Sequence, residues 1–289
     1  MRLLALAGYL FLCSTSAWAT TLEVSRVQMP AWVQRGGQIK PLTPGLELRS
    51  DDIVQTGPGA RALLRMGEGS NIKLGENAKL SLANLGITTE DQGLFRASLN
   101  VLQGAFRFTT DKLLKTQRRD VTIRIASVTA GIRGTDLWGK AADDKDIVCL
   151  IEGHIAVGKE GSPVVEMKDP LSFYIAPKNA APLPVAPVPP EKLKQWATET
   201  EIAEGQAILN NNGRWGLNVL AVSTKNDALA WYDKLRNAGY PAYIRTTKSG
   251  KKTLYSLRIS GLNDEQGAYA LAERLKQDFG ITEQTIFTR

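Results

Sequence analysis

The block from Thr20 to about Ala176 alternates apolar and polar positions with the two-residue period of β-strands. In one such run Val121, Ile123 and Ile125 fall on one face, and the polar residues between them fall on the other. Similar short runs, rich in branched and apolar residues, recur between Gly, Pro, Asn and Asp turn signals. The block therefore predicts an all-β domain, either a sandwich or a β-roll.

The block from 213 to 289 changes its period several times, as expected of alternating strands and helices. Apolar residues recur at helical spacing in two segments, and Gly239 and Gly280 follow them at positions that suit helix ends. The order βαββαβ predicts an α+β, RNP-like domain in which both helices cover one face of a four-stranded sheet. The pattern places the strands at 215–222, 241–246, 253–260 and 285–287, and the helices at 225–238 and 264–279.

A Pro-rich segment, residues 180–190, separates these two blocks. Alternating Pro and small residues favour a semi-rigid spacer, and because proline lacks an amide donor we expect the segment to stay outside any sheet. Glu191–Leu209 then predicts a helix, which the Asn run at 210–212 ends. We therefore expect a multidomain chain of independent units: an all-β domain at 20–176, a linker with a helix at 177–212 and an α+β domain at 213–289.

Residues 1–19 have the composition of an export signal. Arg2 supplies a positive start, Leu3–Leu12 is apolar, and Ala17 and Ala19 frame a small-residue cleavage site. The apolar run is well short of the ~20 residues that span a bilayer, and no later stretch is long enough either. We expect cleavage after Ala19 and a mature chain in the periplasm that does not span a membrane.

Charge changes this picture only slightly. The formal net charge is +7, from 36 Lys or Arg and 29 Asp or Glu, and 12 of these basic residues against 7 acidic ones lie in 212–289. This mild excess suits any polyanion or acidic surface and selects no partner by itself. Export removes nucleic acid from the expected partners.

The inventory of reactive side chains argues against catalysis. His154 is the single histidine and lies in an expected turn, which leaves little material for zinc sites or histidine-based catalysis. Cys149 lies in the apolar run 147–151, which predicts a buried, inert thiol. The acidic residues at 143–146 lack the spaced oxygen ligands of a calcium loop. We expect no enzyme activity, no catalytic residues, no metal site and no cofactor.

Several glycine-rich turn motifs recur in the first block. They lie at 36–45, 51–62, 69–75 and, most specifically, 129–137. Together they resemble a FecR-type domain, which implies an exported all-β module that contacts another envelope protein or polymer. The membrane helix and cytoplasmic domain of FecR-type signal transducers have no counterpart in this sequence, so their signalling role is not expected here. In the last motif we expect Arg133 and Asp136 to pair across a tight turn as a structural clamp.

The second block contains motifs at 217–222, 226–228, 235–243, 254–259 and 272–276. In this order they resemble a SPOR (sporulation-related repeat) domain over the whole block. The resemblance implies binding to peptidoglycan glycan strands, typically those stripped of their peptide stems, and gathering at division sites. Members of that family commonly carry Gln and Ser on the first strand, and an aromatic residue and an Arg on the third. This chain has Asn218, Ala221, Leu254 and Ser256 at those positions.

Strand alternation identifies the sheet face that the two helices leave uncovered. A tyrosine there can stack on a sugar ring, while amide, hydroxyl and guanidinium groups bond to its hydroxyl, N-acetyl and carboxylate oxygens. The candidate glycan-binding residues are Asn218, Leu220, Tyr243, Arg245, Leu254, Ser256 and Arg258.

Two functions remain open on the sequence alone. In one, a non-catalytic cell-envelope protein binds peptidoglycan glycan strands through 213–289 and an envelope partner through 20–176. In the other, the chain is a periplasmic protein-interaction or signalling module with no peptidoglycan binding. A tyrosine and two arginines on a sheet suit a protein contact equally well.

Overall fold

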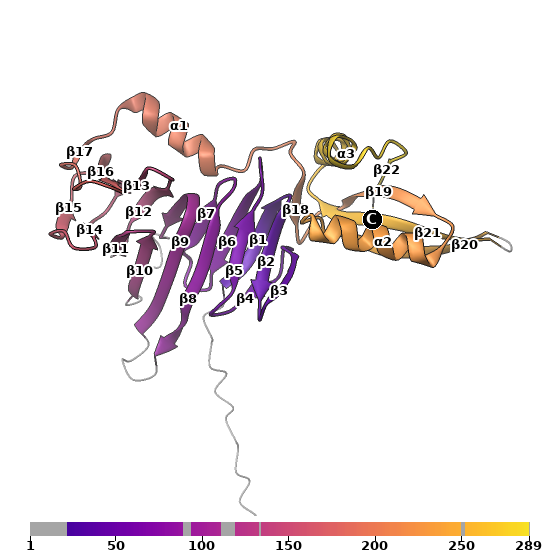
Figure 1. Ribbon diagram of the computed structural model, residues 1–289, viewed down its shortest axis with the longest axis horizontal. Helices are drawn as coiled ribbons and strands as arrows, with labels where there is room; N and C mark the ends of the chain where they lie inside the picture. The colour runs from indigo at the N-terminus through magenta and orange to yellow at the C-terminus, as the bar shows by residue number, and fades with distance from the viewer. Residues whose placement is uncertain (1–21, 89–93, 111–118, 133, 250–251, 289) are drawn as a thin grey trace, which may run out of the picture.

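In the computed structural model the described residues are 22–88, 94–110, 119–132, 134–249 and 252–288. The export signal expected at 1–19 and Arg133, the expected partner of Asp136, lie outside them. Strands make up most of the described chain, which extends from a large β-domain to a smaller domain with helices α2 and α3 (Figure 1). None of the helices in this described part combines the length and the apolar character needed to cross a bilayer.

Two sheets pack against a common apolar core in the first domain. The first sheet runs through β17 (Ala186–Pro187), β16 (Ser172–Pro177), β13 (Lys145–Glu152), β12 (Asp136–Ala141), β9 (Leu94–Thr109), β7 (Asn71–Leu74), β6 (Arg61–Met66) and β1 (Leu22–Gln28), with β4 (Glu47–Leu48) also paired to β1. The second sheet runs through β3 (Gln38–Pro41), β2 (Ala31–Arg35), β5 (Ile53–Thr56), β8 (Lys79–Thr88), β9, β10 (Arg119–Ile125), β11 (Val128–Ile132), β14 (Ile155–Lys159) and β15 (Val165–Met167).

Strand β9 belongs to both sheets and crosses from one to the other. Its residues up to Gln103 pair with β8, and from Gly104 onward they pair with β12. Gly104 has a φ of +82°, which glycine adopts without the usual steric cost. A Cβ at this position would lie 2.6 Å from the Ala78 Cα, so only glycine fits at the crossing. The result is an all-β sandwich, one of the two architectures that the sequence predicts.

The second domain has the predicted βαββαβ order. Its elements are β19 (Trp215–Val222), α2 (Lys225–Asn237), β20 (Tyr243–Ser249), β21 (Lys252–Leu262), α3 (Glu265–Phe279) and β22 (Thr285–Thr288). Antiparallel pairing gives the strand order β22–β19–β21–β20. Buried residues of both helices pack with Leu217, Val219, Leu257 and Ile259 of the sheet, so the helices cover one face and leave the other open.

Local signals explain where the two helices begin and end. The Thr224 hydroxyl accepts a hydrogen bond from the Asp227 amide at the start of α2, and the Asp264 carboxylate accepts one from the Gly267 amide at the start of α3. Gly280 ends α3 in the left-handed conformation with a φ of +71°. These caps lie within a residue or two of the bounds that the sequence predicts.

The linker differs from its prediction in two ways. Helix α1 (Pro190–Thr200) ends well before Leu209, so the longer helix is wrong. The three consecutive apolar residues at 207–209 are buried, and 208–210 forms strand β18 (Ile208–Asn210) instead. The Pro-rich segment also joins a sheet, through β17, because at the outer edge of β16 proline needs no ladder donor.

Strand β18 connects the two domains. It pairs with β1 on one side, and on the other Leu209 pairs with Leu262 at the end of β21. Side chains reinforce this junction: the Trp32 indole donates to the Asn237 carbonyl at 2.9 Å, and the Arg274 guanidinium donates to the carbonyl of Pro58. The linker is therefore part of a continuous structure rather than a free spacer.

Helix α1 packs on the outer face of the first sheet (Figure 1). The Trp196 ring stacks on Trp138, with ring centroids 4.8 Å apart and planes 8° from parallel, and Phe173 meets Trp196 edge-on at 6.0 Å. Two ion pairs also join the end of α1 to this sheet, Lys140–Glu199 at 2.9 Å and Lys73–Glu201 at 2.6 Å. The helix therefore covers an aromatic patch that would otherwise face water.

Substituting Trp196→Ala is expected to lower the free energy of unfolding by about 3 kcal/mol, because the stacked indole is almost fully buried. Urea denaturation of the mature chain measures this change. Lys194→Ala, an exposed position on the same helix, serves as the control and should change little. Equal free energies of unfolding for the two variants would show that packing of α1 on the sheet does not stabilise the domain.

The Cys149 thiol is expected to be unreactive in the native protein. It is fully buried, and burial raises its pKa to about 12, with a smaller contribution from the Asp136 carboxylate. The nucleophilic thiolate is therefore almost absent at any pH well below that value. Iodoacetamide at pH 8 should label the mature chain only in denaturant, and rapid labelling without denaturant would contradict the packing around β13.

Candidate functional site

The open face of the sheet in the second domain is made by residues from all four of its strands, β22, β19, β21 and β20. Cross-strand partners point to the same face, so the strand pairing shows which side chains lie together. Tyr243 pairs with Arg258, Arg258 with Asn218, and Asn218 with Thr285. These four side chains form one row, the central row, that runs straight across the sheet.

Contacts within and beside the central row hold the Asn218 and Arg258 side chains in place. The Asn218 amide donates to the Thr285 hydroxyl at 2.9 Å, and the Arg258 guanidinium lies 5.1 Å from the centre of the Phe287 ring. Asn218 Oδ1 and Arg258 Nε are covered by neighbouring side chains and have no hydrogen-bond partner among the described residues. An acceptor and a donor therefore lie covered and unsatisfied on paired positions, an arrangement that is uncommon in folded proteins.

A second row lies beside the first, toward the tip of the β20–β21 hairpin. Arg245 pairs with Ser256, and Ser256 pairs with Ala221. Beyond it Leu254 is 41% exposed and pairs with Thr247. Six of the seven sequence-predicted residues therefore share the open face: Asn218, Tyr243, Arg245, Leu254, Ser256 and Arg258.

Leu220 does not belong to this set, and the prediction for it is wrong. A β-bulge shifts the register of β19 between Asn218 and Leu220, so that Leu220 pairs with the buried Leu257. Because a bulge adds one residue, Val219 and Leu220 both point toward the helices, and Leu220 packs against the core. Ala221 occupies the open face in its place and is exposed.

The sequence-based set also missed residues from β22. Thr285 and Phe287 alternate with Ile286, which packs against the core, so the same two-residue period would have identified them. Phe287 pairs with Gly216, where an added Cβ would lie 2.4 Å from the Phe287 ring. Glycine at 216 thus lets the ring lie directly over the β19 backbone.

The electrostatics of the open face are those of a site for neutral or anionic ligands. None of the strands β19, β20, β21 and β22 contains Asp or Glu. Arg245 and Arg258 supply positive charge and guanidinium donors, while Tyr243 and Phe287 supply ring surface. The combination can stack on a sugar ring and bond to its oxygen atoms.

The remaining candidate residues serve structural roles. The Asp136 carboxylate is held by Arg107 through two hydrogen bonds of 2.9 and 2.7 Å, and this contact raises the pKa of Arg107. His154, which lies just before β14, pairs with Glu166 of β15. Within the described ranges, no group of three or more His, Cys, Asp or Glu side chains is arranged to hold a metal ion.

Leu220→Ala is expected to cost about 2 kcal/mol of folding free energy, because the side chain packs under the helices, and to leave ligand binding by the open face unchanged. Ala221→Lys, at the adjacent exposed position, should barely alter stability. Thermal denaturation and a binding assay separate the two effects. Loss of binding by Leu220→Ala without loss of stability would place its side chain on the open face after all.

Two family models match this chain. The model described as FecR protein matches residues 52–156, and the model described as SPOR domain matches residues 211–284. A search of curated proteins finds no match.

Among solved structures, similarity is weak. Two crystal structures of a candidate anti-sigma factor from Parabacteroides distasonis, at 1.65 and 2.50 Å resolution, align with a TM-score of 0.40 and 13% sequence identity. The alignments cover 70% and 80% of this chain and 98% and 92% of those chains. Such low similarity assigns neither fold nor function.

The SPOR match spans every strand and helix of the open-faced domain except β22, which begins one residue after the match ends, and the FecR match lies within the β-sandwich. FecR and SPOR domains are binding and regulatory domains, and a SPOR domain implies peptidoglycan binding. The chain thus carries a FecR domain followed by a C-terminal SPOR domain, in the order that its sequence motifs predict.

Proposed function

We propose that this protein is a non-catalytic component of the cell envelope that binds peptidoglycan glycan strands on the open face of its SPOR domain. In this proposal residues 1–19 direct export to the periplasm, the FecR domain at 20–176 contacts another envelope protein or polymer, and 177–212 links it to the SPOR domain at 213–289. Gathering at division sites would follow if stem-free strands are the preferred ligand.

The central row carries this proposal. Tyr243, Arg258, Asn218 and Thr285 span the sheet in register, and Phe287 adds a second ring beside Arg258. Sugar rings have apolar faces and polar edges, so flat aromatic surface next to guanidinium and amide groups matches both. Asn218 and Arg258 are both partly exposed, so the accessible parts of their polar side chains would bond to hydroxyl or N-acetyl groups of the glycan.

The charge of the open face favours glycan strands without peptide stems as the ligand. An amidase that removes the stem leaves a lactyl carboxylate on each muramic acid, so the stripped strand is a regular polyanion. Arg245 and Arg258 on a face with no acidic strand residue would bind such carboxylates through charge-assisted hydrogen bonds. Stem-free strands should therefore bind more tightly than intact peptidoglycan.

The second candidate function is a protein contact with no peptidoglycan binding. Leu254 favours it, because this exposed apolar side chain stands where SPOR domains commonly carry an aromatic residue. An apolar residue at the rim suits a protein surface as well as a sugar. The two functions differ in one measurable result: only a glycan-binding protein is retained on purified peptidoglycan.

Pull-down of the mature chain on purified peptidoglycan, before and after amidase treatment, tests the proposal. Retention should rise after treatment, and Tyr243→Ala with Arg258→Ala should weaken binding at least about tenfold, since a stacked ring and a charged hydrogen-bond donor are lost. Lys225→Ala, an exposed cation on α2, is the matched control and should bind normally. No retention of the folded wild-type chain on either preparation would favour the protein contact.

A further inference from the structure

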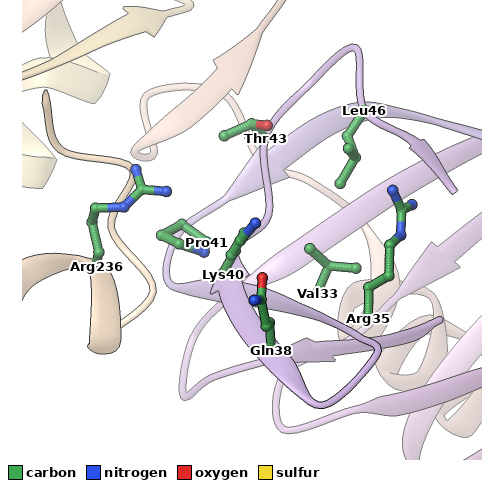
Figure 2. Close-up of a pocket in the computed structure, with 8 residues that line it drawn as sticks. All are labelled: Val33, Arg35, Gln38, Lys40, Pro41, Thr43, Leu46 and Arg236. Atoms are coloured by element: carbon green, nitrogen blue, oxygen red, sulfur yellow. The ribbon is translucent and has the colours of Figure 1, made fainter. Parts of the chain in front are cut away.

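A hollow of about 280 Å³ lies where the two domains meet. Its walls come from β2, β3 and the turn after β3 in the FecR domain, and from the end of α2 in the SPOR domain. Figure 2 shows Lys40 on the β3 side and Arg236 on the α2 side. The lining residues are Val33, Arg35, Gln38, Lys40, Pro41, Thr43, Leu46 and Arg236.

The hollow has a positive charge that nearby carboxylates do not balance. Arg35 is neutralised by the buried Asp52, which accepts two hydrogen bonds from it at 2.7 and 2.6 Å. Lys40 and Arg236 have no ion pair in the part of the chain that the structure describes. Arg236 is held by the Ala242 carbonyl at 3.3 Å and by the Tyr232 ring, so its guanidinium is positioned without being neutralised.

Neutral side chains add hydrogen-bond donors and apolar walls to the two cations, a combination that suits an acidic ligand. The Gln38 amide and the Thr43 hydroxyl add hydrogen-bond donors, while Val33, Pro41 and Leu46 provide apolar walls. Small-molecule sites combine such apolar walls with a few polar groups, and they start at about 300 Å³. The space therefore suits one acidic group of a larger ligand.

A second hollow lies beside the first, toward the open face of the SPOR sheet. It measures about 240 Å³ and shares Thr43 with the first hollow. Ser260 of its lining pairs with Gly216, so it continues the open face at the end nearest the FecR domain. Its other lining residues are Pro44, Leu209, Asn210, Asn211, Gly213, Pro241 and Gly261.

We propose that the ligand of the open face extends past Ser260 and Thr43 into the first hollow, where Lys40 and Arg236 bind one of its carboxylates. This inference rests on the proposed function and adds that the FecR domain contributes directly to peptidoglycan recognition. Two sources supply a carboxylate: the lactyl group of a stem-free strand and the peptide stem of an intact one. The chemistry is the same for both, a charge-assisted hydrogen bond from an ammonium and a guanidinium.

The test measures binding of the mature chain and of Lys40→Gln, Arg236→Gln and the double variant. The ligands are stem-free strands, the same strands with their carboxylates converted to amides, and intact peptidoglycan. Lys225→Gln, at the other end of α2, removes one positive charge away from the hollow and is the control. Because Arg236 also bonds to the Ala242 carbonyl, Lys40→Gln alone tests the hollow if the double variant fails to fold.

The double variant should bind stem-free strands about tenfold more weakly than the wild type, the loss expected for one charged hydrogen-bond pair. Amidated strands should bind the wild type at least as weakly, because Arg245 and Arg258 of the open face lose their carboxylate partners too. The Lys40 and Arg236 substitutions should then have no further effect. A defect confined to intact peptidoglycan would also support the hollow and assign its carboxylate to the stem.

Other outcomes overturn the inference or the function separately. If Lys40→Gln and Arg236→Gln bind every preparation like the wild type, the hollow has no role. Loss of binding by Arg258→Ala would then still support the open face. If Arg258→Ala binds normally while the hollow variants lose affinity, the hollow is supported and the open face is not. No retention of the wild type on any preparation contradicts both.

Discussion

The pairing of β18 with β1 on one side and β21 on the other is the contact on which the arrangement of the two domains depends. It extends the sheet of the FecR domain into the sheet of the SPOR domain. Trp32 and Arg274 then fix the helical side of the junction by bonding to backbone carbonyls. Because sheet hydrogen bonds set both distance and direction, the turn after β3 lies at one end of the open face, where it completes the two hollows.

The open face itself follows from how the second domain buries its apolar residues. Helices α2 and α3 cover only one face, so residues of opposite parity on the strands are free of the core. Because these strands contain no Asp or Glu, no carboxylate of the sheet offsets the charges of Arg245 and Arg258 on the face. A surface with rings, guanidinium groups and no carboxylates favours sugars and anions over cations.

Two-residue and helical periods were enough to predict an all-β first domain, the order of elements in the second domain, and the open-face position of six of the seven candidate residues. These periods failed where pairing with another strand decides the conformation. A bulge moved Leu220 to the helix face, because the extra residue appears only when β19 pairs with β21. The 207–209 run became a strand because two sheets offer it partners on both sides. The hollow joins Lys40 to Arg236, which lie far apart in sequence, so no local pattern could have predicted it.

The central claim is that peptidoglycan glycan binds across the open face and reaches the FecR domain. A crystal structure of the mature chain with a stem-free glycan fragment tests this claim most directly. The account predicts sugar rings over Tyr243 and Phe287, bonds from Asn218 and Arg258, and a carboxylate between Lys40 and Arg236. Glycan bound to the helix-covered side, or to the FecR domain alone, would contradict it.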